Sequence, residues 1–371
     1  MVAAFHELIN FDAVPPRGAS RGNACVGGRK FSSVSEWTDT HTWDGLARAL
    51  DRPEGAAVVV RRWTDDKRQE FLLLHRNAEG SDYEGDWAWT SPAGCRQPGE
   101  AVYPAALREL AEEAGLSGLD PWAVDLSGPW ARFAVDVEAD TEISLVDPEH
   151  DRYEWVGLEQ ALARVLPEAV GEAQFGEMAH LPRVTIGFRR MVDADLAHVL
   201  RWQQASHARH WFRDEPQDLA GARVRYGPRI DGLAPVRVWV VEIKGKASGY
   251  LQDYRVRDHH DYALKTQDAD AVGFDYLIGE PHLVSRGVGT AMVWAFLRDV
   301  LCPSYPDTPR FSASPDHRNQ RSLRVLEKCG FTQGVRIDLP AADGEPATSE
   351  IVCTLDRAHW FGMPDDAVDV R

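Results

Sequence analysis

The sequence predicts two mixed domains in tandem, an α+β domain followed by an α/β domain. The chain has 371 residues, which suggests two or three domains, and 44% of them are hydrophobic, enough for large cores. The net charge of −17 is uneven, because residues 1–180 carry 32 Asp and Glu against 16 Lys and Arg. Strand and helix patterns alternate in each half. We expect a lead segment over 1–45, a first domain over 46–178 and a second over 181–363.

Composition argues against several classes of protein. No run of about 18 apolar residues occurs, so we expect no membrane span, and the N-terminus lacks the basic start and apolar core of a secretory signal. The five cysteines are scattered and show no metal-ligand spacing, which favours a reduced, cytoplasmic protein. An acidic surface of this kind makes nucleic acid an unfavourable partner.

The first domain opens with two strands and continues into a helix. The stretches "GAAVVVRRW" (55–63) and "EFLLLHR" (70–76) are apolar runs separated by a polar turn. In the helix that follows, Pro104 suits an early position and Gly115 suits the C-terminal stop. The stretch "YEWVGLEQALARVL" (153–166) then predicts a strand followed by a second helix.

Three glutamates of that first helix project together. Residues three and four apart share a helix face, so Glu109, Glu112 and Glu113 form one acidic patch. Like charges so placed repel each other unless a cation lies among them. Hard divalent cations favour carboxylate oxygens, and Mg²⁺ commonly bridges protein carboxylates to the phosphates of a substrate. A solvated acidic helix face is the alternative interpretation, since charge runs usually lie on the surface.

The wider spacing resembles the Nudix box: Gly94, five residues, Glu100, seven residues, then Arg-Glu-Leu-Ala-Glu-Glu-Ala-Gly-Leu. The resemblance covers roughly residues 46–178. It implies a Nudix α/β/α sandwich that hydrolyses a nucleoside diphosphate linked to another group. Ala93 stands where the family usually has the first of two glycines.

The Nudix resemblance also implies roles for single residues. Glu112, Glu113 and the Gly94 carbonyl would bind Mg²⁺ or Mn²⁺, and the metal would polarise water and neutralise the leaving phosphate. Glu109 would orient or deprotonate the attacking water, and Arg108 would pair with Glu109 or its neighbours. The family often recruits one more glutamate, for which we propose Glu154.

The second domain shows a different order of elements. Residues 193–207 have a helical period behind a capping Asp, and residues 236–254 predict a hairpin that turns at Lys244–Lys246. "AVGFDYLIG" (271–279) is a buried strand, and "SRGVGTAMVWAFLRDVL" (285–301) is a glycine turn into an apolar helix. "NQRSLRVLEKCGF" (319–331) predicts another helix, and "EIVCTL" (350–355) a closing strand.

The glycine turn before a helix offers bare backbone N–H groups to a pyrophosphate, although a Gly-x-Gly pair can equally be a tight loop. The order of strand, turn and helices resembles the coenzyme A site of GNAT N-acetyltransferases, a mixed-sheet fold. Val284 replaces the usual first Gln or Arg of the motif, so Arg286 would supply the basic contact. The contacts to acetyl-coenzyme A implied by this resemblance are Leu277, Ile278, Ser285, Arg286, Gly287, Val288, Gly289, Thr290 and Asn319.

Longer stretches are similar to aminoglycoside 6′-N-acetyltransferases, in order over about residues 181–357. These are "VTIGFRRMVDADLAHVLRWQQASHARHWF", "GYLQDYRV", "GFDYLIGEPHLVSRGVGT" and "SPDHRNQRSLRVLEKCGF". The resemblance implies that Asp275 holds or deprotonates the acceptor amine, since an ammonium must lose a proton before it attacks a thioester. The implied acceptor contacts are Trp211, Phe212, Gln252, Tyr254 and Asp261.

Alternatives remain for these residues. Trp211 and Phe212 could be core aromatics and Gln252 a surface residue, whereas a charge such as Asp275 within an apolar strand is costly unless it is partnered or functional. The stretch from Asp253 to Glu280 contains seven acidic and three basic residues, and this local negative charge suits a cationic acceptor.

One departure affects the acetyl-transfer chemistry. Leu326 stands where the family often has the tyrosine that protonates the leaving thiolate. Tyr250, Tyr254, Tyr276 or water could take its place.

The sequence as a whole therefore predicts a bifunctional enzyme. It would acetylate a small cationic amine and hydrolyse a nucleoside diphosphate derivative, without nucleic acid or membrane partners and with room for a homodimer. Aminoglycoside acetylation would make it an antibiotic-resistance enzyme. Alternatively, the first domain senses a nucleotide and regulates the second, the acceptor is a biosynthetic amine or a protein N-terminus, or the second domain only docks a partner.

Overall fold

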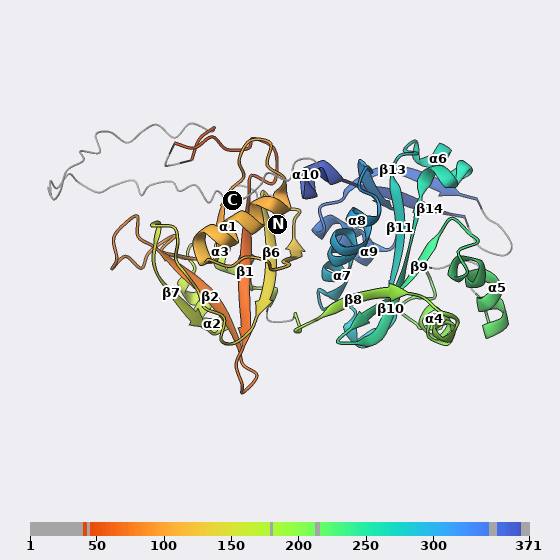
Figure 1. The fold of residues 1–371 in the computed structure, drawn as a ribbon, viewed down its shortest axis with the longest axis horizontal. Coiled ribbons are helices and arrows are strands. Elements are labelled where there is room, and N and C mark those ends of the chain that lie inside the picture. Colours follow the sequence, from red (N-terminus) through yellow and green to blue (C-terminus); the bar gives the residue numbers. More distant parts are fainter. Residues whose placement is uncertain (1–39, 43–44, 179–180, 212–215, 341–346, 365–371) are drawn as a thin grey trace.

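The computed structural model describes residues 40–42, 45–178, 181–211, 216–340 and 347–364. Within them the chain forms two mixed sheets of seven strands each, which lie side by side (Figure 1). The lead segment expected over 1–45 falls almost entirely outside the described residues. Within the described part of the chain, every helix is too short or too polar to cross a bilayer.

The first sheet is built on the two apolar strands that the sequence predicts. Its strand order is β3-β2-β1-β6-β5, with β4 paired to β1 and β7 to β2, and β1 and β6 run parallel. The strands are β1 (Gly55–Trp63), β2 (Gln69–Arg76), β3 (Trp89–Thr90), β4 (Ala93–Cys95), β5 (Trp122–Asp125), β6 (Trp130–Val137) and β7 (His150–Val156).

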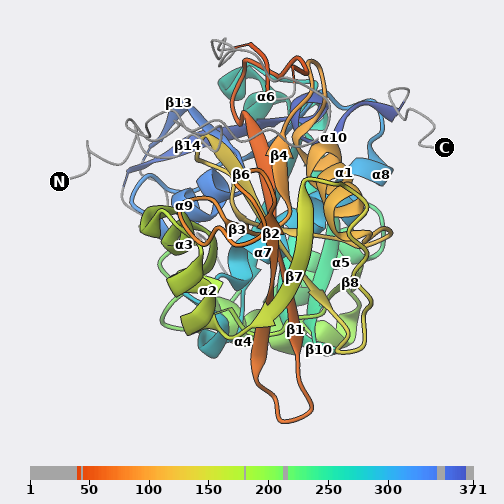
Figure 2. The same ribbon diagram turned by 90° about the vertical axis from the view of Figure 1, so that its left-hand side faces the viewer.

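Helices cover both faces of this sheet. Alternate residues of a strand point to opposite faces, and in β1 Val58 packs in the cluster of α1 (Val102–Ala114), whereas Val59 packs with α2 (Leu158–Arg164) and α3 (Glu168–Phe175). Figure 2 shows α1 on one side of the strands and α2 and α3 on the other. The result is an α/β/α sandwich whose central strands are buried on both faces.

The second sheet has the order β13-β14-β12-β11-β10-β9-β8, with only β11 and β12 parallel. The predicted hairpin is confirmed, because Lys244 and Gly245 both take positive φ (52° and 70°) between β9 and β10. The strands are β8 (Ile186–Arg190), β9 (Arg237–Ile243), β10 (Lys246–Arg255), β11 (Val272–Ile278), β12 (Arg310–Ala313), β13 (Thr332–Leu339) and β14 (Thr348–Asp356).

The helices of the second domain also divide between the two faces. Residues of α4 and α5 share a cluster with Val238, Val240 and Tyr250, whereas α7 and α9 pack against Val241, Leu251 and Phe274 on the opposite face. A π-helical turn, Leu297–Leu301, continues α7. The helices are α4 (Leu196–Gln204), α5 (Leu219–Ile230), α6 (His260–Thr266), α7 (Val288–Phe296), α8 (Cys302–Ser304), α9 (Gln320–Lys328) and α10 (Arg357–Phe361).

One predicted helix is shorter than expected. The period over residues 193–207 predicts a single capped helix, but α4 begins at Leu196 after a 3₁₀ turn over Asp193–Asp195 and ends at Gln204. The Asp195 carboxylate accepts from the backbone N–H of Val192 and two N–H groups of Arg189. It therefore fixes the turn rather than capping a longer helix.

The two domains share one continuous apolar core. Trp294 of α7 is fully buried, and its ring lies 5.6 Å from that of Tyr103, 5.4 Å from Phe133 and 4.7 Å from Phe361. Tyr103 belongs to α1 and Phe133 to β6, so the apolar helix that the sequence predicts is buried on the sheet side by its own domain and on the other side by the first domain.

This shared core gives a prediction about stability. We expect Trp294→Ala to destabilise the protein by about 3–5 kcal/mol, the usual cost of truncating a fully buried tryptophan. Because the ring packs in both domains, hydrogen exchange measured by mass spectrometry should accelerate in β1 as well as in β11. The control is Val224→Ala, since Val224 is 79% exposed. Acceleration confined to the second domain would contradict a shared core.

Candidate active sites

The three glutamates predicted to cluster do line one cavity. Helix α1 ends at Gly115, whose φ of 69° suits glycine, and it carries all three residues into a hollow of about 140 Å³. Glu109 and Glu113 are 6% and 4% exposed, whereas the side chain of Glu112 is 52% exposed. The solvated-face alternative therefore fits Glu112 alone.

Arg108 holds most of these carboxylates. Its guanidinium donates to Glu109 Oε1 at 2.7 Å, to Glu112 Oε2 at 3.0 Å and to both oxygens of Glu100 at 2.9 and 3.0 Å. A fifth contact reaches the carbonyl of Cys95 at 3.0 Å. One cation thus joins the helix face to the loop before it, the role that the sequence predicts for this arginine.

The loop packs closely against the buried glutamates. A Cβ at Gly94 would lie 2.2 Å from Glu109 Oε1, so a larger residue there would displace the Glu109 carboxylate, and the N–H of Ala93 donates to Glu113 Oε2 at 2.8 Å. Burial raises the pKa of Glu109 to about 7, although Arg108 acts to lower it. Burial and the neighbouring Glu109 raise the pKa of Glu113 well above its ordinary range.

The donor set suits a hard divalent cation in chemistry. Burial favours the protonated forms of Glu109 and Glu113, and both carboxyl groups would ionise beside Mg²⁺, which binds carboxylate and carbonyl oxygens. Among the described residues, however, no group of three or more His, Cys, Asp or Glu side chains is already arranged to hold a metal ion. Arg108 supplies the compensating charge in this structure.

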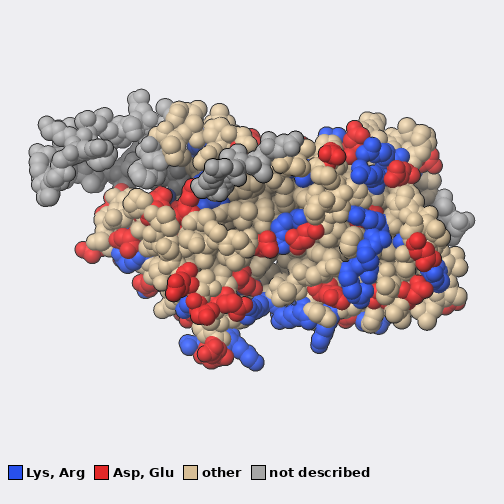
Figure 3. Space-filling view, in the orientation of Figure 1, with Lys and Arg blue, Asp and Glu red and all other residues tan. Residues whose placement is uncertain are grey.

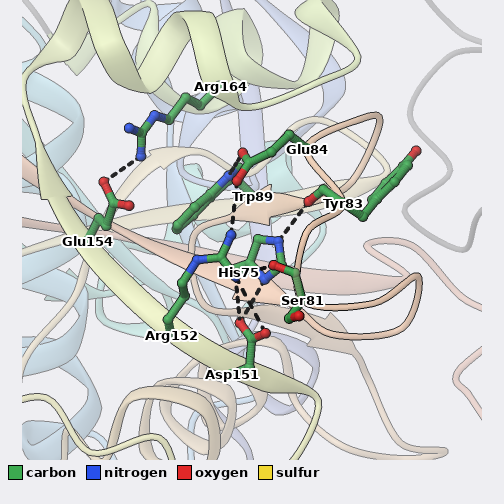
Figure 4. Close-up of polar contacts among 9 residues, drawn as sticks. All are labelled: His75, Ser81, Tyr83, Glu84, Trp89, Asp151, Arg152, Glu154 and Arg164. Atoms are coloured by element: carbon green, nitrogen blue, oxygen red, sulfur yellow. Dashed lines mark hydrogen bonds and ion pairs between the residues drawn. The ribbon is translucent and has the colours of Figure 1, made fainter.

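Glu154 does not join this cavity. It lies on β7, bonded to Arg164 of α2, and Figure 4 shows it beside a separate polar network around His75. In that network the ring nitrogens of His75 contact Asp151 Oδ1 at 2.7 Å and the carbonyl of Tyr83 at 2.8 Å. The assignment of Glu154 to the metal site therefore needs correction, because Glu154 does not line the cavity of the three glutamates and its carboxylate pairs with Arg164 instead.

Asp147 and Glu149 line the glutamate cavity instead. Both precede β7, in a loop where the spacing of the carboxylates along the sequence does not indicate a site. Glu149 contributes to the raised pKa of Glu113, after burial and Glu109, which shows how near the two carboxylates lie. Only the pairing of β7 with β2 brings this loop back to α1.

The glycine turn opens a second and larger cavity of about 590 Å³, which we call the coenzyme cleft after the prediction made for its residues. Gly287 takes φ 74° and Ser285 φ 61°, and a Cβ at Gly289 would lie 3.2 Å from Val325. The turn therefore leaves the backbone bare at the start of α7. The predicted contacts that line the cleft are Leu277, Ile278, Ser285, Arg286, Gly287, Gly289, Thr290 and Asn319, whereas Val288 is buried in the core.

A third hollow, which we call the acidic cavity after Asp275, Asp316 and Glu350, encloses about 490 Å³ beside β10 and β11, and Arg209 and Arg318 line it as well. Asp275 lines it, with Gln252 donating to Asp275 Oδ2 at 2.7 Å and Arg229 donating to Gln252 Oε1 at 2.6 Å. Burial raises the pKa of Asp275, and the Gln252 bond and Arg229 oppose the rise. Asp316 and Glu350 line the same cavity from loops and strands far away in sequence.

The coenzyme cleft and the acidic cavity meet. Trp211, Tyr276, Asn319 and Ser322 line both of them. Tyr276 Oη lies 2.7 Å from Ser322 Oγ, and burial raises its pKa, so the phenol keeps its proton. Tyr250 lines only the acidic cavity, where its hydroxyl accepts from Gln203, and Leu326 is fully buried.

Other predicted acceptor residues lie elsewhere. Asp261 is exposed in the first turn of α6 and does not line the acidic cavity. Tyr254 does not line it either, because its ring packs against Gly273. Phe212 lies outside the described residues. The assignment of Asp261 and Tyr254 to the acceptor surface therefore needs correction.

Comparison with known proteins agrees with this geometry. The NUDIX domain model matches residues 52–176, and the acetyltransferase (GNAT) domain model matches residues 191–339. The chain therefore belongs to the Nudix family through its first domain and carries a GNAT acetyltransferase domain in its second.

Individual relatives differ between the halves. The asymmetrical bis(5′-nucleosyl)-tetraphosphatase of Sus scrofa is 32% identical over 110 residues, 26% of this chain and 70% of that protein. The aminoglycoside N(6′)-acetyltransferases type 1 of Klebsiella pneumoniae and Serratia marcescens are each 26% identical over 159 residues, 42% of this chain and 78% of theirs. A solved aminoglycoside acetyltransferase in complex with coenzyme A is 24% identical, covering 47% of this chain and 96% of that one, with a TM-score of 0.41.

The buried glutamates predict a pH dependence of stability. Glu109 ionises near pH 4.5 when unfolded and near 7 when folded. The unfolded state therefore holds fewer protons in this window, and stability falls as pH rises from about 4.5 to 7. In metal-free buffer, urea unfolding of Glu109→Gln should show a smaller fall than the wild type. A fall of equal size in both proteins would contradict the assignment.

Proposed function

We propose that the second domain transfers an acetyl group from acetyl-coenzyme A to the amine of a small polycationic acceptor. The observation that carries this proposal is the meeting of the coenzyme cleft with the acidic cavity at Tyr276 and its neighbours. A thioester in the first would face an amine in the second. The curated relatives of this domain are named for aminoglycosides, whose several ammonium groups suit the acidic cavity.

Asp275 is the group that prepares the amine. An ammonium cannot attack a thioester, so its proton passes to the Asp275 carboxylate, whose raised pKa makes it a better acceptor. The free amine then forms the C–N bond as the C–S bond breaks, and the departing sulfur takes a proton. Gln252 and Arg229 hold the carboxylate in place.

Tyr276 replaces the family tyrosine in this scheme. Tyr276 lies at the junction of both cavities, and its hydroxyl keeps its proton. The hydroxyl donates to the Ser322 carbonyl at 3.2 Å, and it would exchange that bond for one to the negative charge that develops on sulfur. The hydroxyl of Tyr250 is tied to Gln203, and Tyr254 does not line the cavity.

Asp316 and Glu350 extend the acidic cavity away from Asp275. Arg318 holds the pKa of Asp316 far below its usual range, so this carboxylate stays charged, and it pairs with Arg318, which lines the same cavity, at 2.7 Å. Several fixed carboxylates at different distances suit an acceptor with several amines. A biosynthetic amine of lower charge is the alternative acceptor.

For the first domain we propose divalent-dependent hydrolysis of a compound linked through a nucleoside diphosphate. Glu112, Glu113 and the Gly94 carbonyl would hold Mg²⁺ or Mn²⁺, with Glu149 in place of Glu154. When bound, the metal would polarise water and neutralise phosphate charge. Glu109, whose pKa is near 7, is suited to accept the proton of the attacking water.

One observation favours a second function for this domain. Arg108 already donates hydrogen bonds to Glu100, Glu109 and Glu112, and the described residues hold no group arranged for a metal ion. A domain closed in this way could bind a nucleotide without hydrolysing it and regulate the acetyltransferase.

Asp275→Asn tests the acetyl transfer. We expect turnover of a cationic amine to fall by on the order of 10²-fold, the usual contribution of a positioned base. Asn cannot take the proton, so raising the pH, which supplies free amine, should rescue part of the loss. The measurement is thiol release against pH across an aminoglycoside and amine panel, with coenzyme A affinity unchanged.

Two control variants sharpen this test. Asp261→Asn removes a carboxylate outside the acidic cavity and should leave turnover unchanged. Tyr276→Phe removes a hydroxyl at the junction without removing charge, so it should lower turnover without the pH rescue. Wild-type turnover in Asp275→Asn near neutral pH would place the acceptor site elsewhere.

Glu113→Gln and Glu112→Gln test the hydrolase. Each removes a negative ligand at constant shape, so each should lower Mg²⁺-dependent hydrolysis of a dinucleoside polyphosphate by about 10-fold or more. Acetyl transfer should not change, and Glu154→Gln should retain hydrolysis. If the wild type binds the nucleotide but hydrolyses none of a nucleotide panel, the sensing function is favoured.

A further inference from the structure

The coenzyme cleft is walled by both domains. Its lining includes Gly176, Glu177 and Leu181, which follow α3 of the first domain, as well as the glycine turn of the second. A Cβ at Gly287 would lie 2.5 Å from Leu181 Cδ2, so the chain leaving the first domain packs directly on the turn. The first domain is thus part of the cleft surface.

Helix α9 presents a row of cations to this cleft. Arg321, Arg324 and Lys328 are three, four and seven positions apart, so they share one helix face, and all three line the cleft. Such cations are the side chains that recognise phosphate groups. Of the four basic residues that line the cleft, only Arg286 lies outside this row, on the glycine turn.

Carboxylates of the first domain already hold two of these cations. Arg324 donates to Asp125 Oδ2 at 2.7 Å, and Asp125 is buried beside Arg132. Lys328 Nζ pairs with Glu177 Oε2 at 2.5 Å. Glu177 also acts on Arg324, whose pKa its neighbours raise.

The side chains of Asp125 and Glu177 differ in how freely they can move. Asp125 has a 5% exposed side chain and four partners, including the N–H and hydroxyl of Ser127. Glu177 is 45% exposed and lies in the cleft itself, whereas Lys328 is only 17% exposed and its carbonyl accepts from Leu126 N at 2.9 Å. The backbone of Lys328 is therefore anchored and its side chain is the more buried of the pair, so Glu177 is the partner that has room to turn to solvent.

We propose that Glu177 is a built-in competitor for the phosphates of coenzyme A, through which the first domain sets the affinity of the second for its coenzyme. This inference rests on the proposed acetyl transfer, because it takes the cleft to be the coenzyme site. Phosphate bound at Lys328 displaces Glu177, which turns to solvent. By linkage, coenzyme binding then loosens this contact between the domains.

The experiment is calorimetric titration of coenzyme A into the full chain. Glu177→Gln should tighten binding by about 3-fold or more, the range of a partly exposed ion pair. Lys328→Met should weaken binding, and Glu177→Gln should have no further effect in the Lys328→Met background. High salt should shrink the difference between Glu177→Gln and the wild type.

Glu172→Gln is the matched control, since Glu172 is an exposed acid of α3 outside the cleft, and it should leave affinity unchanged. Thermal unfolding of each variant confirms that it is folded. If coenzyme A binds the wild type and Glu177→Gln with equal affinity, the competition is overturned while the acetyltransferase proposal stands. If coenzyme A does not bind the wild type, both are overturned.

Discussion

The packing of α7 between the two sheets is the constraint on which the rest of this molecule depends. The Trp294 ring packs against aromatic rings from both domains, so the core cluster around α7 is buried only where the domains meet. The same helix begins at the glycine turn of the coenzyme cleft. Hence the element that joins the domains also positions the coenzyme site, and the interface reaches that cleft through Leu181 and Glu177.

Buried carboxylates mark both proposed sites, and their surroundings differ in kind. Asp275 is held by one amide and, behind it, one guanidinium, which leaves room for a proton or an ammonium. Glu109 and Glu112 each accept a hydrogen bond directly from Arg108, which leaves less room for a further cation beside them. In the functions we propose, the Asp275 site would therefore admit a cationic acceptor directly, whereas the glutamate site would exchange an arginine contact for a metal. Basic side chains also gather over the second domain on the face in Figure 3, which follows the uneven charge of the sequence.

Much of the fold follows from local pattern. The apolar runs of β1, β2 and β11, the glycine stop of α1 and the Lys244–Gly245 turn are local signals, and the structure confirms them. Site residues on one helix or one strand, such as Glu109 with Glu113, are equally readable. Residues gathered across elements are not, because their distance along the chain carries no signal. The sequence therefore gives no signal that Glu149 lines the glutamate cavity, or that Asp316 and Glu350 line the acidic cavity.

The sequence by itself determined the two domain classes, the glutamate face, the glycine turn and the carboxylate in an apolar strand, because each is a short-range pattern of chemistry and period. Only the tertiary structure decided what each group faces. In the folded chain Arg108 pairs with the glutamates of α1, Glu154 pairs with Arg164, and Glu177 of the first domain pairs with Lys328 of the second. These pairings depend on how whole sheets and helices pack, and packing is set by the summed burial of side chains far apart in the chain.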